Sequence, residues 1–178
     1  MTEKKGVYDK AKEGMRLSER ILAALPGFGG YKEKELRRES DRLVRNHLYE
    51  RLMDARKDLK ETFQILSENR VQEVLTDMDH LVMRFDRVSE SINHASYGYA
   101  GFFNVVKIDE PKLDKMIQFD TDLIDSVNNI VEETESFKKE AAKQQFENVR
   151  NHISNLEDMI EALEDTFEQR HEVIEGVV

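Results

Sequence analysis

Histidine and carboxylate side chains have the clearest potential for chemistry in this chain, because five His stand among 37 Asp and Glu. A two-metal site in a helical bundle needs inward-facing Glu residues and two Glu-x-x-His motifs. The chain has one such motif, Glu168 to His171. A second group shares one face of a predicted helix, about 100° from its apolar seam: Glu73, Asp77, His80, Glu90 and His94. This placement is typical of a solvated flank. We therefore predict no metal and no cofactor, and keep a metal-binding bundle enzyme as an alternative.

No other catalytic pattern is present in the sequence. Cys is absent, which excludes a thiolate nucleophile and Cys-ligated metal. There is no Gly-x-Ser-x-Gly elbow, no phosphate loop and no dinucleotide-binding fingerprint. The glycines of "PGFGG" (26–30) follow one predicted helix and precede another, without the Lys-Ser/Thr pair of a phosphate loop. We predict that the protein is not an enzyme, with no catalytic or cofactor-binding residue.

Asp120 is an acidic residue on an otherwise apolar seam, in "MIQFDTDLID". A buried carboxylate without a partner costs several kcal/mol, so Asp120 should meet a cation if the helix buries it. We predict a structural ion pair that fixes helix register, and the candidate partners are Arg37, Arg38, Arg42 and Arg45.

The stretch "HASYGYAGFF" (94–103) combines four aromatic residues with small ones. Small residues let helix backbones approach closely, and aromatic rings bury large areas around such a contact. We predict a packing node, with a ligand site as the alternative. The residues concerned are Phe28, Tyr31, His94, Tyr97, Gly98, Tyr99, Gly101 and Phe102.

Apolar residues spaced three and four apart predict helices along most of the chain. An amphipathic segment over 1–25 ends at the Pro/Gly break of 26–30, and bundle helices follow over 31–142. Their expected bounds are Tyr31–Asn69, a helix from Val71 into the 94–103 stretch, and Glu110–Ala142. "SENRVQ" and "KKEAAKQQ" lack Gly and Pro, so either a turn or a continuous helix is possible at each of them. No internal repeat is evident. The expected fold is all-α: one domain, an elongated antiparallel bundle of four to five helices.

The last segment, 143–178, has the most regular spacing of the chain and predicts a coiled-coil helix. Its seam comprises Phe146, Val149, Ile153, Leu156, Ile160, Leu163, Phe167, Arg170 and Ile174. We assign self-association to the middle of this seam, and we expect a homo-oligomeric scaffold or adaptor that contacts other proteins. The association residues are Ile153, Leu156, Ile160, Leu163 and Phe167.

Charge is unevenly distributed along the chain, whose net charge is −10. Residues 1–60 carry 16 Lys and Arg against 11 Asp and Glu, so the remaining residues carry −15. The acidic balance excludes nucleic acid as the main partner. The basic N-terminal part is expected to pack beside the acidic C-terminal helices. As an alternative, the amphipathic 1–25 segment binds an anionic membrane surface.

Hydropathy gives no reason to expect a membrane-spanning helix, because no apolar run approaches about 20 residues. "MTEKKGVYDK" lacks the apolar core of a signal peptide. We therefore expect a cytoplasmic protein.

Two stretches, "PGFGGYKEKELRRESDRLVR" (26–45) and "SYGYAGFF…LDKMIQFD", carry a resemblance to known proteins. In them the chain resembles a family of uncharacterised prokaryotic all-helical proteins. The resemblance covers the first two thirds of the chain and implies a helical fold with no assigned activity. In layout the chain is also similar to phage-shock-type membrane-remodelling proteins, a likeness of shape and not of motif.

Overall fold

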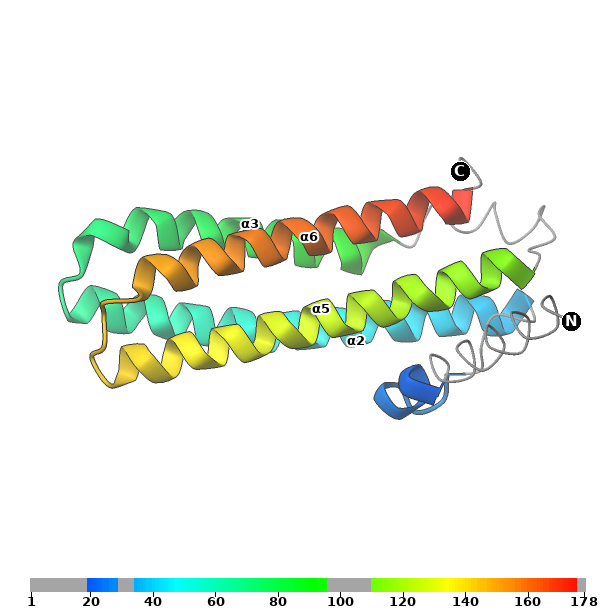
Figure 1. Cartoon of the computed structure of the whole chain (residues 1–178), viewed down its shortest axis with the longest axis horizontal. Coiled ribbons are helices and arrows are strands. Elements are labelled where there is room, and N and C mark those ends of the chain that lie inside the picture. Colours follow the sequence, from blue (N-terminus) through cyan, green and yellow to red (C-terminus); the bar gives the residue numbers. More distant parts are fainter. Residues whose placement is uncertain (1–18, 29–33, 96–109, 176–178) are drawn as a thin grey trace, which may run out of the picture.

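The computed structural model describes residues 19–28, 34–95 and 110–175, and these are almost entirely helical (Figure 1). A short helix over 19–24 precedes the long elements. These are α2 (Lys34–Glu68), the 3₁₀ turn η1 (Gln72–Val74), α3 (Leu75–His94), α5 (Glu110–Ala142) and α6 (Val149–Glu175). The described residues contain no strand, and the helices pack against one another. The predicted all-α bundle is confirmed.

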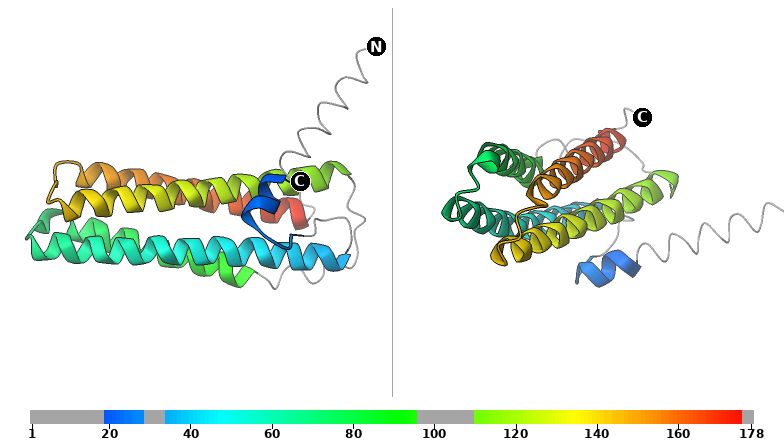
Figure 2. Two further views of the ribbon diagram at one scale, coloured as in Figure 1. Left: turned by 90° about the horizontal axis from the view of Figure 1, so that it is seen from below. Right: turned by 60° about the vertical axis from the view of Figure 1, so that its left-hand side comes forward.

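The long helices form two antiparallel hairpins that lie side by side, α2–α3 and α5–α6 (Figures 1 and 2). Between the hairpins, α2 contacts α5 and α3 contacts α6. Both of these neighbouring pairs run in the same direction (Figure 1). A helix of 35 residues such as α2 is about 50 Å long, which makes the bundle a rod.

The buried stripes of the two hairpins coincide after a shift of 75 residue numbers. In the first helix of each hairpin the matching buried pairs include Leu48 and Leu123, and Leu52 and Val127. The same shift applies again in the second helix, with the pairs Val74/Val149, Met78/Ile153, Leu81/Leu156, Phe85/Ile160, Val88/Leu163 and Ile92/Phe167. The sequence shows no repeat because this equivalence lies in spacing and burial and not in residue identity.

Both hairpin turns use the same helix ending. After α2, the Val71 N–H donates to the Leu66 carbonyl at 3.0 Å and the Arg70 N–H to the Ser67 carbonyl at 3.1 Å. After α5 the corresponding bonds run from Gln145 to Glu140 and from Gln144 to Ala141, at 3.1 and 2.9 Å. This is a Schellman motif, which places one residue in the left-handed region.

The left-handed residues are Arg70 and Gln144, with φ of 60° and 58°. Glycine is the usual residue at this position, and neither turn has one. The structure therefore resolves both open questions of continuity: "SENRVQ" forms a turn, and α5 ends before α6 begins.

Residues 19–28 pack on the side of the bundle. Ile21, Leu25 and Phe28 are buried in the common core. Arg20 donates to both carboxylate oxygens of Asp125 on α5, at 2.8 and 2.6 Å. Gly27 has a φ of 93°, which permits the sharp turn after Pro26.

Candidate functional site

The C-terminal seam to which we assigned self-association is used inside the chain. Ile153, Leu156, Ile160, Leu163 and Phe167 are all buried, with exposed fractions of 0–8%. They belong to the common core, where α6 packs mainly against α5 and α3. Regular three-four spacing describes an apolar stripe without saying whether its partner belongs to the same chain, so self-association through these residues stays a prediction.

The predicted packing node is only partly described. Phe28 is buried, in keeping with packing, whereas His94 has an exposed side chain on α3. The His94 Nε2 lies 3.0 Å from the Glu90 carboxylate one turn earlier. The remaining residues of the node lie outside the described residues: Tyr31, Tyr97, Gly98, Tyr99, Gly101 and Phe102.

Asp120 belongs to a buried layer of charges near one end of the bundle. Arg170 on α6 donates from Nε to Asp120 Oδ1 at 2.6 Å, and its Nη2 lies 3.0 Å from Asp41 Oδ1 on α2. Arg45 donates to the other oxygen of Asp41 at 2.9 Å and to the Asn93 carbonyl of α3 at 3.3 Å. The layer therefore links α2, α3, α5 and α6.

Arg170 is thus a partner of Asp120 that our four candidate arginines did not include. The side chains of two of those candidates, Arg37 and Arg38, lie outside the described residues. Arg45 joins the layer through Asp41, while Arg42 is exposed. Arg170 and Asp120 have no exposed surface. Among the described residues, two positive and two negative charges meet in this layer, and their pairing offsets part of the desolvation cost of burying them. A signal was present in the sequence, because Arg170 occupies a seam position that otherwise takes apolar residues.

Ion pairs join neighbouring helices along the rest of the rod. Arg56 of α2 binds Asp86 of α3 through two hydrogen bonds, and this contact holds the pKa of the Asp86 carboxyl below its usual range. Lys138 of α5 contacts Asp58 and Glu61 of α2, and the two carboxylates raise the pKa of Lys138 to about 12. These pairs are part-exposed, so each contributes modestly to stability.

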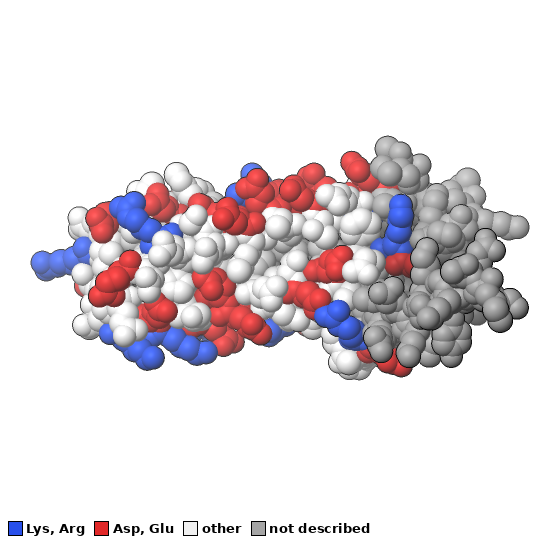
Figure 3. Space-filling view, in the orientation of Figure 1, with Lys and Arg blue, Asp and Glu red and all other residues white. Residues whose placement is uncertain are grey.

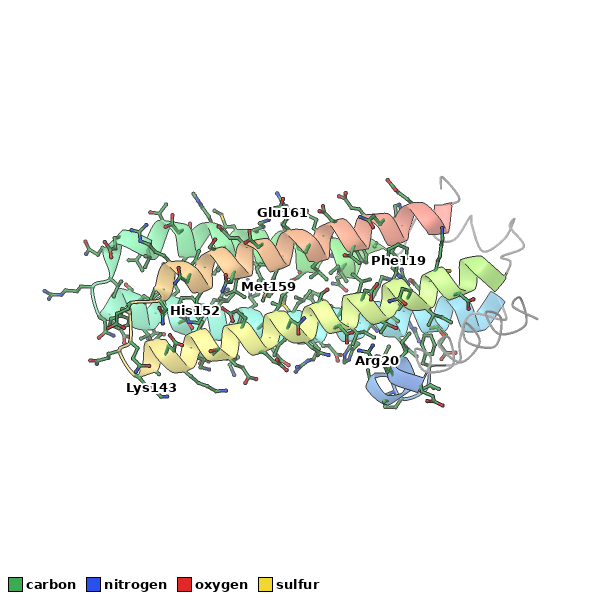
Figure 4. All side chains as sticks on the ribbon, viewed as in Figure 1. Arg20, Phe119, Lys143, His152, Met159 and Glu161 are labelled. Carbon is green, nitrogen blue, oxygen red and sulfur yellow. The ribbon has the colours of Figure 1, made fainter. Side chains whose placement is uncertain are left out.

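His152 joins α6 to α5 beside the second turn, where Figure 4 labels it. Its Nδ1 lies 2.8 Å from Glu133 Oε1, and its Nε2 lies 3.2 Å from Glu140 Oε2. The ring stacks on Phe137 with centroids 4.8 Å apart. Contact with His152 and a hydrogen bond from Asn148 lower the pKa of Glu140. Sequence reasoning missed this residue because it flanks the apolar seam.

A groove opens between the C-terminal ends of α3 and α6. Its volume is about 580 Å³, within the range of about 300–1,000 Å³ that is usual for binding pockets. The wall from α3 consists of Ser91, His94 and Ala95, and the wall from α6 of Phe167, Glu168, His171 and Glu172. The Glu-x-x-His motif noted in the sequence therefore borders this groove, opposite His94.

The outer face of α6 continues from the groove as an acidic ridge, which we define as Asp158, Glu161, Asp165, Glu168 and Glu172. All five residues are exposed and spaced three and four apart, so they line one side of the helix. Figure 4 shows Glu161 on the outer edge of α6, and Asp and Glu outnumber Lys and Arg on the face shown in Figure 3. Within the described residues, only Glu161 of the ridge has an ion-pair partner, Arg84 of α3 at 3.2 Å.

Metal binding finds no support in the described part of the chain, where no group of three or more His, Asp and Glu could hold an ion. Among the helices described, none is long and apolar enough to cross a membrane. Comparison with protein-family models, curated proteins and solved structures finds no match for the chain. The resemblance noted in the sequence therefore stays a prediction.

Proposed function

We propose that the protein is a non-enzymatic adaptor, a helical rod that recruits other proteins through the α3–α6 face. The observation that carries this proposal is the acidic ridge of α6 beside the groove. The α6 helix holds eight Asp and Glu against two Arg, and one of these, Arg170, is buried in the charge layer. A charged face of this kind steers a partner of opposite charge and selects against like-charged ones.

Self-association through the C-terminal seam is not part of the proposal, because those residues already form the intramolecular core. Leu22 and Met83 are the large apolar side chains that stand exposed on the described surface. They come from separate elements, residues 19–24 and α3, and give no continuous apolar patch for a second copy.

The membrane-surface alternative concerns residues 1–25, of which 19–25 are described and 1–18 lie outside the described residues. Of the apolar residues in 19–28, Ile21 and Leu25 are buried, and Leu22 is 49% exposed. Arg20, one of the cations assigned to an anionic membrane, pairs with Asp125 instead. These contacts favour a packing role for residues 19–28 over insertion into lipid.

The test is affinity capture of the tagged full chain from its native host, followed by mass spectrometry. A ridge variant, Asp158→Asn with Asp165→Asn, removes two charges that form no ion pair among the described residues. We expect wild type to retain a partner at near-stoichiometric amounts, and the variant to retain less of it at the same salt concentration. Capture of no protein above background, or equal capture by both chains, would contradict the proposal.

A further inference from the structure

Resting on the adaptor function proposed above, we infer that the α3–α6 groove and the acidic ridge bind a basic segment of the partner protein, one that presents several Lys or Arg side chains along its length. The negative charge of the site favours a cationic partner. Glu168 and Glu172 stand on the α6 wall, and neither pairs with a Lys or Arg among the described residues. Anionic partners, including nucleic acid, are repelled by the same charges.

The floor of the groove suits the stems of long cationic side chains. Phe167 lines the groove from α6 and is 8% exposed, and Ala95 lines it from α3 and is half-buried. Lys and Arg lay their methylene stems along apolar surface and keep the charged end in water. A guanidinium or ammonium over an aromatic face gains a further attraction. Phe167 therefore receives the stem, and Glu168 and Glu172 receive the charge.

The length of the acidic surface argues for a peptide segment over a single small cation. From Asp158 to Glu172 the ridge covers 14 residue steps, which is about 21 Å along a helix. The groove occupies one end of that distance, since its α6 wall begins at Phe167. A basic helix or extended strand can reach both the groove and Asp158, whereas one Lys-sized ligand reaches only the groove.

The first experiment measures binding of a synthetic basic peptide, about 15 residues long with Lys at every third or fourth position, to the full chain. Isothermal titration calorimetry at low and high salt is the readout. We expect binding to wild type that weakens with salt, and no binding of the same peptide with Glu in place of Lys. Glu168→Gln with Glu172→Gln should weaken binding about tenfold, since two charge contacts are lost.

The matched control is Asp79→Asn with Glu147→Gln. It removes the same charge at the turn end of the bundle, where both residues are exposed. We expect its affinity to stay within about twofold of wild type, because exposed charges farther away than about 10 Å are screened at 0.1 M salt. Equal weakening by the two double variants would overturn the groove as the site and leave only non-specific attraction to an acidic protein.

A second pair of variants tests the groove by occupying it. Ser91→Arg places a cation in the α3 wall, and Ser136→Arg makes the same change on the exposed surface of α5. Both positions are exposed, so both variants should keep the wild-type thermal unfolding midpoint. We expect Ser91→Arg to lower peptide affinity by about tenfold or more and Ser136→Arg to leave it unchanged. Normal affinity in Ser91→Arg would overturn the inference.

Free spermine decides between a protein segment and a small polycation. Spermine binding as tightly as the peptide would overturn the assignment to a protein segment.

Host capture separates this inference from the adaptor function. If Ser91→Arg loses peptide affinity but still retains the native partner, the groove is not where that partner binds, although the protein remains an adaptor. If wild type retains no partner, the adaptor function fails, whatever the peptide does.

Discussion

The two hairpins of the rod share their spacing and differ in their chemistry. Buried positions recur 75 residues apart, from Leu48/Leu123 to Ile92/Phe167. At the level of the charge layer, however, Arg45 of the first hairpin corresponds to Asp120 of the second, and Ala95 corresponds to Arg170. The two hairpins share the spacing of their buried residues and the hydrogen bonds that end their first helix, although their helices differ in length. The unequal residues determine how the hairpins pair, because opposite charges must meet at one level.

Because the hairpins share their apolar spacing but not their buried charges, we expect the charge layer to favour one alignment of the two hairpins. Apolar stripes tolerate a shift along the rod at modest cost, whereas a shift of one turn would leave Asp41, Asp120 and Arg170 buried apart from one another. An uncompensated buried charge is strongly destabilising. We therefore expect the layer to fix the register of the rod and, with it, the alignment of α3 and α6 beside the groove.

The largest expected effect comes from removing the centre of the layer. Arg170→Met leaves Asp41 and Asp120 without their shared partner, and we expect a loss of about 3–5 kcal/mol in the free energy of unfolding. Urea unfolding at pH 7 measures this loss. The neighbouring Gln169→Met, at an exposed position, should change stability by less than about 0.5 kcal/mol. A loss below about 1 kcal/mol for Arg170→Met would refute the role of the layer.

Equivalent core positions offer the most direct test of the shared spacing. Leu81 and Leu156 are fully buried and lie 75 residues apart. Each substitution to Ala should cost about 2–5 kcal/mol, because it removes buried methyl groups and leaves a cavity. We expect the two losses to agree within about 1 kcal/mol. A much smaller loss in the free energy of unfolding for one of them, measured by urea unfolding, would show that the core is packed less tightly at that position.

Acid should weaken the first hairpin through the contact between Arg56 of α2 and Asp86 of α3. The lowered pKa of Asp86 means that its contact with Arg56 stabilises the fold above the normal Asp pKa, and that this stability is lost as pH falls through the folded-state pKa. Asp86→Asn should cost roughly 0.5–1 kcal/mol at pH 7. Near pH 2 wild type and variant should unfold at the same urea concentration. A difference that persists in acid would assign the effect to packing.

An effect of similar size but opposite sign is expected at the two turns. Arg70→Gly and Gln144→Gly relieve the left-handed conformation at the two turns, and each should add about 0.5–1 kcal/mol. Thermal unfolding midpoints measure this gain. Ser67→Gly, inside the last turn of α2, is the control and should destabilise instead. A gain at one turn alone would indicate that the two helix endings differ in strain.

Much of this fold can be predicted from the sequence. The bounds expected for α5, Glu110–Ala142, agree with the structure, and the expected end of α2 is one residue too long. The second turn could not be predicted because Gln144 takes a conformation usually reserved for Gly. Spacing alone identified the seam of α6 but not its partner, and it placed Arg170 on that seam without showing that Asp120 lies opposite. Such pairings depend on how the helices assemble.

The candidate groove was the least predictable feature, because its walls come from helices more than 70 residues apart in the sequence. Glu168, His171 and His94 were visible as chemistry-bearing residues, yet periodicity places each on a solvated flank. Only the packing of α3 beside α6 brings them to one place.

The adaptor function is tested most directly by photo-crosslinking in the native host. A photoreactive amino acid at position 91, in place of Ser91, stands in the groove wall, and the same substitution for Ser136 on α5 is the control. We expect a crosslink from position 91 to a basic segment of one protein, competed by the Lys peptide, and none of that product from position 136. Crosslinking of the same partner from both positions, or from position 136 alone, would contradict it.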